Sequence, residues 1–104
     1  MAITSNPTIQ SGAVSTGNGT HSFLNVTANT LVKATPGRIC TISIVDAGTG
    51  TGTINDVATL GAAGVANQVF TIPEAVGTYV VDFPCGNGIA LFPAPGSVLA
   101  VSFN

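Results

Sequence analysis

The sequence predicts an all-β protein, a single β-sandwich or jelly-roll domain with an extended N-terminal arm. Three observations support this prediction. The chain has 104 residues, enough to close one hydrophobic core and no more. Apolar and β-branched residues recur in short runs, which Gly, Pro, Asn and Asp interrupt at short intervals. No run with helical spacing reaches the length of an ordinary helix, so strands are expected throughout.

The first 20 residues differ in composition from the rest of the chain. They contain no charged residue, and their sparse aliphatic side chains are Ile3, Ile9 and Val14, among many Ser, Thr, Asn and Gly. Such a segment cannot form a core of its own. We therefore expect residues 1–20 to be a frayed tail or an arm that pairs with a neighbouring molecule, and residues 21–104 to form the sandwich domain.

Strands are expected wherever a short apolar run is bounded by turn residues. The clearest run is 38–45, in which Cys40, Ile42 and Ile44 alternate with polar residues and are expected to face the core. Seven or eight strands result, as a sandwich or jelly roll requires. The predicted strands are 22–26, 30–34, 38–45, 51–57, 67–72, 78–83, 89–92 and 98–103.

Two connections are predicted from local composition. The Gly-rich residues 46–50 indicate a hairpin that joins the two strands on either side of them. Residues 56–66 are rich in Ala and Gly, and they fit one helical turn as well as a loose strand or a loop. We interpret them as a loop with weak strand content.

The strand at 78–83 is expected to place Tyr79, Val81 and Phe83 on one face. Pro84 is expected to close this strand, because proline has no N–H to donate to a sheet. Phe83 is accordingly predicted to share its surroundings with the other two side chains.

Charged side chains make up only 6% of the chain and sum to −2, whereas roughly 25% is usual in soluble domains. Little repulsion then keeps copies apart, so we expect a surface that partner proteins or sister subunits cover. The alternative is a monomer kept soluble by its hydroxyls and amides. Nucleic acid is not an expected partner, because the sequence has no basic stripe. A membrane is not expected either, because no apolar run reaches the length of a bilayer span.

No catalytic, cofactor-binding or metal-binding residue is predicted, and an enzyme is not expected. His21 is the one histidine, and its partnership with Cys40 or Cys85 is a coincidence of composition that we disfavour. Both thiols are expected to be buried, although a disulfide between them stays open. No pair of acids is placed for glycoside cleavage, and no Cys/His cluster has zinc spacing. Asp56 is expected to accept backbone hydrogen bonds at a strand end, and Arg38 to pair with an acid.

The N-terminal residues read Met-Ala-Ile-Thr-Ser-Asn-Pro. They have neither the positive leader nor the apolar stretch of a secretory signal. We therefore expect synthesis and use in a cytoplasm, where lone thiols stay reduced.

Several blocks of turn and strand residues form a recognisable pattern over about residues 31–104. They are LVKATPGRI at 31–39, GTIND at 52–56, IPEAVGTY at 72–79 running into DFP at 82–84, GIAL at 88–91 and PGSVLAVSF at 95–103. In these blocks the chain resembles the small β-rich virion structural proteins of tailed bacteriophages.

The resemblance implies a β-sandwich or jelly-roll virion component, such as a capsid decoration (cement) protein that binds over the joints between capsid subunits. Its partners would be the major capsid protein and further copies of itself, as a homotrimer, in a virion assembled after synthesis in the host bacterial cytoplasm. Ile3, Ile9, Val14 and Arg38 are the expected interface residues. A tail, baseplate or fibre component is an alternative. A carbohydrate-binding β-sandwich for host attachment is another, although the chain has no Trp and one Tyr.

Overall fold

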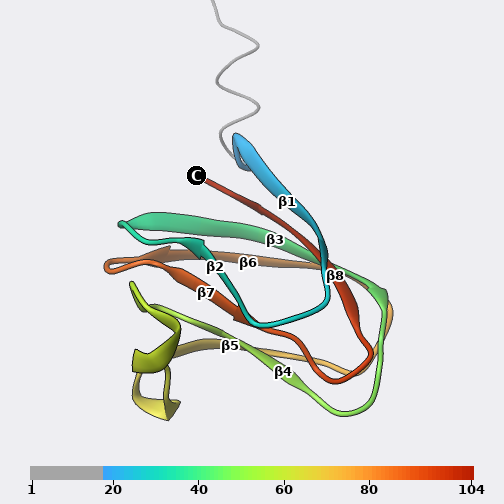
Figure 1. Ribbon diagram of the computed structural model, residues 1–104. Coiled ribbons are helices and arrows are strands. Elements are labelled where there is room, and N and C mark those ends of the chain that lie inside the picture. The colour runs from blue at the N-terminus through green and yellow to red at the C-terminus, as the bar shows by residue number, and fades with distance from the viewer. Residues whose placement is uncertain (1–17) are drawn as a thin grey trace, which may run out of the picture.

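A computed structural model describes residues 18–104 and confirms the all-β prediction: two antiparallel four-stranded sheets pack against each other as a β-sandwich (Figure 1). The first sheet has the strand order β1 (His21–Val26), β8 (Val98–Phe103), β3 (Gly37–Asp46) and β6 (Gly77–Cys85). The second has the order β2 (Thr30–Lys33), β7 (Ile89–Phe92), β4 (Gly52–Asn55) and β5 (Gln68–Ile72). Each strand overlaps one of the eight predicted ranges.

The first half of the chain pairs with the second half in reverse order. Strand β1 pairs with β8, β2 with β7, β3 with β6 and β4 with β5, all antiparallel. Further pairs, β3 with β8 and β4 with β7, complete the two sheets. Only the connection from β4 to β5 stays within one sheet, and every other connection crosses between the sheets.

The hairpin predicted at residues 46–50 is therefore wrong, because the strands β3 and β4 that flank it belong to different sheets. Gly48 and Gly50 do turn the chain, with φ angles of 65° and 87°. The turn is held from the other side, since the Thr49 N–H donates to the Pro95 carbonyl at 2.9 Å. A local turn signal specifies a reversal of direction but not the strand with which the chain pairs afterwards.

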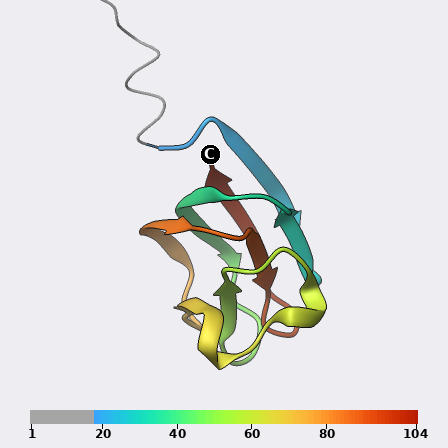
Figure 2. The ribbon, with the colours of Figure 1, turned by 90° about the vertical axis from the view of Figure 1, so that its left-hand side faces the viewer.

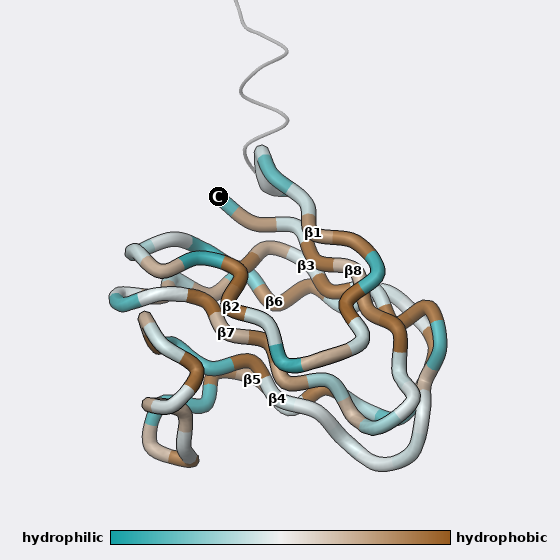
Figure 3. The backbone as a smooth tube through the Cα atoms, in the orientation of Figure 1, coloured by the Kyte–Doolittle hydropathy of each residue, from teal (hydrophilic) through white to brown (hydrophobic). Residues whose placement is uncertain are grey.

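The core lies between the sheets and consists largely of isoleucine, whose branched side chain suits a pleated surface. Hydrophobic and hydrophilic residues alternate along the strands, as Figure 3 shows. Burial of one such side chain contributes about 1.5–3 kcal/mol relative to leaving it exposed. The buried cluster comprises Val26, Ile39, Ile42, Ile44, Ile54, Ile72, Cys85, Ile89, Leu91, Leu99 and Val101.

An irregularity between β3 and β6 changes which residues are buried. The pairing register shifts between Ile39 and Thr41, and Asp82 on the partner strand has a left-handed φ of 47°. Because of this shift, both Ile39 and Cys40 are buried, and Phe83 is 44% exposed. The sequence prediction that Phe83 shares the face of Tyr79 and Val81 is wrong for this reason.

Pro84 does not close β6 as predicted. The strand continues to Cys85, with Pro84 opposite Arg38. β6 is an edge strand of the first sheet, where a proline is tolerated because one side of the strand has no partner in the sheet.

Residues 56–66 were predicted as a loop with weak strand content. The structure instead forms two short 3₁₀ turns, η1 (Leu60–Ala62) and η2 (Val65–Asn67), at one end of the sandwich (Figure 2). Alanine and glycine permit such turns, and β4 already ends at Asn55.

Candidate functional site

The outer face of the first sheet carries only uncharged side chains over most of its length. Alternation along each strand places these residues on the side away from the core. The pairing registers align Ser22, Ser102, Thr41 and Val80 across the four strands, and Ala100, Ser43 and Thr78 in the next row. We call this face the uncharged sheet surface; it comprises Ser22, Leu24, Thr41, Ser43, Val45, Thr78, Val80, Val98, Ala100 and Ser102.

Several apolar side chains of the uncharged sheet surface stand in solvent. Leu24 is 67% exposed, Val45 61% and Val80 76%. They come from three different strands, so their apolar area is spread over the face. Covering them with another protein would remove apolar surface from water, which is favourable at about 25 cal/mol per Å².

Four hydroxyl groups on this face, those of Thr41, Ser43, Thr78 and Ser102, are hydrogen-bonded in pairs. Thr41 Oγ1 and Ser102 Oγ are 2.6 Å apart, and Thr78 Oγ1 donates to Ser43 Oγ at 3.4 Å. Ser102 Oγ also accepts from the Thr41 N–H at 3.2 Å. A polar group that keeps its partner loses little when a second surface excludes water. Covering the uncharged sheet surface with another protein therefore costs little desolvation free energy.

Among residues 18–104, the charged groups next to this face lie at its two ends. Arg38 forms an ion pair with Asp82 at one end, so the sequence prediction that Arg38 pairs with an acid is confirmed. Asp46 lies at the other end, opposite Val98. The Asp82 side chain is 65% exposed, and such an ion pair contributes about 0–1 kcal/mol to stability.

The remaining predicted interface residues, Ile3, Ile9 and Val14, lie outside residues 18–104. The structure does show how the described chain begins. Thr20 donates from its N–H to the Phe103 carbonyl at 3.1 Å and to Asn104 Oδ1 at 2.9 Å. Thr20, which the sequence assigns to the arm, is thus bonded to Phe103 at the end of β8 and to Asn104.

Lys33 and Asn104 meet at the same end of the sandwich, where Lys33 Nζ donates to the Asn104 carbonyl at 3.1 Å. Asn104 also exchanges backbone hydrogen bonds with Arg38. Both cations of the chain therefore lie beside its last residue.

A second cluster of polar residues surrounds Asp56, directly after β4. Asp56 Oδ2 accepts the Gly86 N–H at 3.0 Å, and Oδ1 accepts the N–H groups of Asn87 at 2.8 Å and Gly88 at 3.2 Å. The predicted role of Asp56 as a backbone acceptor is confirmed. Its partners, however, lie in the β6–β7 loop, about 30 residues away along the chain.

The pKa of Asp56 reflects two opposing effects. Burial raises the pKa of this carboxyl. The backbone N–H groups of Asn87, Gly86 and Gly88 and the Asn87 side chain lower the pKa by more, so it lies below the ordinary value of 3.8. In the folded protein the carboxyl group of Asp56 is therefore ionised at neutral pH.

Shallow hollows surround this corner of the sandwich. One of about 360 Å³ lies beside Asp56, Asn67 and Asn87, and another beside Thr53, Asn55 and Phe92. Their amides are used internally: Asn55 Nδ2 donates to Gly64 O and Asn67 Oδ1, and Asn67 Nδ2 donates to Ala62 O. The amide nitrogens of Asn55 and Asn67 therefore hold the loop in place.

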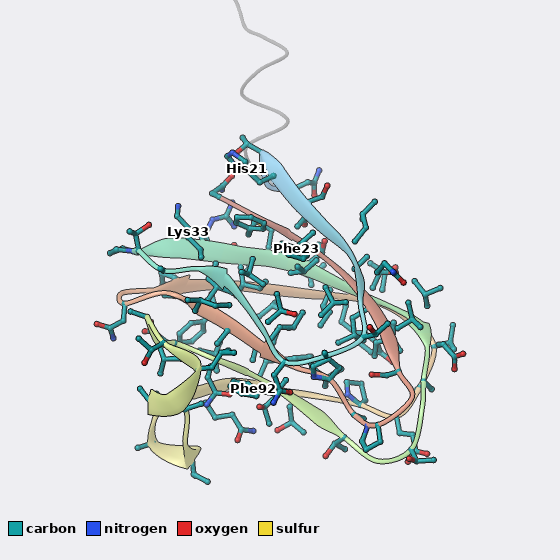
Figure 4. All side chains as sticks on the ribbon, in the orientation of Figure 1. His21, Phe23, Lys33 and Phe92 are labelled. Carbon is teal, nitrogen blue, oxygen red and sulfur yellow. The ribbon has the colours of Figure 1, made fainter. Side chains whose placement is uncertain are left out.

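The residues with reactive side chains lie apart from one another. His21 is at the end of β1, where its ring stacks on Phe103 with centroids 5.5 Å apart (Figure 4). Cys40 and Cys85 are buried free thiols, and their sulfurs donate to the carbonyls of Arg38 and Phe83. Burial, with a smaller contribution from the Asp56 charge, raises the pKa of Cys85 to about 11.

Within residues 18–104, no three His, Cys, Asp or Glu side chains lie together in a way that could hold a metal ion. The same residues include no helix long and apolar enough to cross a membrane. Comparison with models of protein families, with curated proteins and with solved structures finds no match to this chain.

Proposed function

We propose that this chain is a structural protein of a virion, a capsid decoration (cement) protein that binds over the capsid subunits of a tailed-phage head. The observation that carries the proposal is the uncharged sheet surface. It has exposed Leu24, Val45 and Val80, and most of its hydroxyls already have hydrogen-bond partners. A face of this kind suits association with another protein better than it suits solvent or a small molecule. The resemblance of residues 31–104 to small phage virion proteins supplies the identity of the partner.

We also assign the sandwich to the jelly-roll type. The pairing of first strand with last, second with seventh, third with sixth and fourth with fifth supports this assignment. Jelly rolls are frequent among viral capsid domains, although a fold alone does not establish a function.

A cement protein strengthens a shell by modest contacts with several subunits, which together raise the total binding strength. In this proposal the uncharged sheet surface supplies one contact. Residues 1–17, with Ile3, Ile9 and Val14, supply another, either to the capsid or to the other copies of a homotrimer. Arg38, at the border of the face, would lie at the rim of the interface.

The test compares two variants that each gain one positive charge, one variant on the proposed interface and the other away from it. Val80→Lys places a charge on the uncharged sheet surface, and Val65→Lys places the same charge on η2. The two valines are 76% and 89% exposed, so neither change should disturb the core. Co-sedimentation with capsids that lack the protein should show saturable binding of the parent chain and of Val65→Lys, and at least tenfold weaker binding of Val80→Lys.

Equal binding of the two variants would reject the uncharged sheet surface as the interface. A parent protein that ignores capsids but binds purified tails or baseplates would move the proposal to the tail. Light scattering on the same samples gives the mass, and a trimer is expected.

Sugar recognition is the weaker alternative. Carbohydrate sites present an aromatic platform with free polar partners. Here the side-chain amides of Asn55 and Asn67 donate to the backbone carbonyls of Gly64 and Ala62. Glycan binding that survived Val80→Lys would nevertheless favour host attachment over the capsid role.

A further inference from the structure

The chain contains two Asn-Gly pairs, Asn18-Gly19 and Asn87-Gly88. Such pairs are the sequences most prone to deamidation, because glycine has no side chain to hinder its backbone nitrogen from attacking the asparagine amide. Asn18 and Asn87 are both exposed, so solvent reaches both. Sequence and exposure alone would predict equal deamidation rates at the two sites.

The structure separates them through Asp56. The Gly88 N–H, whose nitrogen would be the nucleophile, donates to Asp56 Oδ1 at 3.2 Å, and the Asn87 N–H donates to the same oxygen at 2.8 Å. We propose that Asn87-Gly88 is a modification site for succinimide-forming deamidation, and that the Asp56 carboxylate holds it closed in the folded protein.

Deamidation begins when solvent base removes the proton of the Gly88 nitrogen. This nitrogen attacks the side-chain Cγ of Asn87, a new N–C bond closes a five-membered succinimide ring, and the Cγ–NH₂ bond breaks. Ammonia leaves with a proton from solvent. Water then adds to either ring carbonyl and opens the ring, so that aspartate or isoaspartate replaces Asn87. One amide nitrogen is lost and one negative charge is gained.

Asp56 opposes the first step in two ways. Removal of the Gly88 proton breaks a hydrogen bond, and it creates a negative nitrogen next to a negative carboxylate. The pKa of Asp56 lies below its ordinary value of 3.8, so the carboxylate is charged under the mildly alkaline conditions that favour deamidation.

Packing fixes the same nitrogen in place. Gly88 is buried, and a Cβ added to it would lie 2.4 Å from the Val57 carbonyl oxygen and 2.6 Å from that of Lys33. The backbone at Gly88 therefore has little room to turn toward the Asn87 side chain without opening the loop. Gly19 is also crowded, with the Phe103 nitrogen 2.8 Å from an added Cβ, so the hydrogen bond to Asp56 is what distinguishes the two sites.

The modification would be irreversible, and it would weaken the contacts of the β6–β7 loop, in which Asn87 lies. The Asn87 side chain hydrogen-bonds to Asp56, so the new carboxylate at position 87 would lie beside the Asp56 carboxylate, whose oxygens already accept three backbone N–H groups of the loop. Two negative charges placed side by side repel each other. The converted protein should therefore hold its β6–β7 loop more weakly than the original.

Peptide mass spectrometry tests the proposal on the full chain. Lys33 and Arg38 are the only tryptic sites, so Asn18 and Asn87 fall in separate peptides, 1–33 and 39–104. The parent protein and Asp56→Asn are incubated at mildly alkaline pH, and fragment spectra locate each converted amide. We expect Asn18 to convert steadily in both proteins, and Asn87 to convert at least fivefold faster in Asp56→Asn than in the parent.

Two controls separate this mechanism from general unfolding. Ile42→Val, a core variant with lowered stability, should leave the rate at Asn87 close to that of the parent. Asn87→Gln should abolish the signal at position 87. The proposal is overturned if Asn87 converts as fast as Asn18 in the parent protein, if Asp56→Asn leaves its rate unchanged, or if Ile42→Val accelerates it equally.

Discussion

Asp56→Ala should lower the free energy of unfolding by about 2–4 kcal/mol at neutral pH, although Asp56 lies outside the core. The side chain accepts three backbone hydrogen bonds from the β6–β7 loop. Gly88 is buried, and an orphaned buried N–H costs about 1–3 kcal/mol. Gly86 and Asn87 are exposed, so water replaces the carboxylate there and the two lost bonds together add about 1 kcal/mol.

The effect should depend on pH in a defined direction. Because the pKa of Asp56 is lower in the folded chain than in the unfolded chain, its charge stabilises the fold fully above about its ordinary value of 3.8. That contribution is lost as the pH falls through the folded pKa. The stability difference between the parent and Asp56→Ala should therefore narrow below about pH 4.

Urea unfolding of the two proteins at pH 7 and pH 3 measures both expectations. Asp46→Ala is the matched control, because Asp46 is exposed and accepts one long hydrogen bond, from the Gly48 N–H at 3.5 Å. Its loss should stay below about 0.5 kcal/mol. A loss below about 0.5 kcal/mol for Asp56→Ala at pH 7, or an equal loss at both pH values, would refute the role assigned to this carboxylate.

Three further changes test other parts of the fold. Deleting residues 1–17 should weaken capsid binding and leave the midpoint of thermal unfolding unchanged. Deleting residues 1–20 also removes the hydrogen bonds of Thr20 to Asn104, so it should lower the stability by about 1 kcal/mol and lower that midpoint. Gly88→Ala should prevent soluble expression, because its Cβ would meet two backbone oxygens, while Gly61→Ala, with open space around it, should be tolerated. The Cys85 thiol, buried and with its pKa raised to about 11, should react with a thiol reagent only as the protein unfolds in urea; a fast reaction in buffer would contradict its burial.

Strand positions could be predicted from the sequence because they depend on local spacing. In β3 the alternation of Ile42 and Ile44 with Thr41 and Ser43 settles both the strand and its buried face. Strand β8 behaves in the same way, since Leu99 and Val101 are buried. Where one face of a strand must be buried, the alternation of side chains every two residues leaves little choice of which residues face the core.

Features that depend on distant residues could not be predicted. The register shift opposite Asp82 turns Phe83 outward, and neither strand alone shows it. The partners of Asp56 follow the same rule: Asn55-Asp56 signals a polar strand end, but its target loop is reached only through the pairing of β4 with β7. The uncharged sheet surface likewise requires the order of four strands that are separated along the chain.

The free edges of the first sheet bear on how copies of this protein meet. An uncharged sheet with open edges would pair indefinitely with other sheets. Here β1 contains Asn25 with a left-handed φ of 55°, and β6 contains Asp82 with a φ of 47° followed by Pro84. A strand added to β6 is thereby confined to the stretch 77–81. Association through the uncharged sheet surface does not use these edges and is not limited in this way. We therefore expect this surface to contribute more of the binding than residues 1–17.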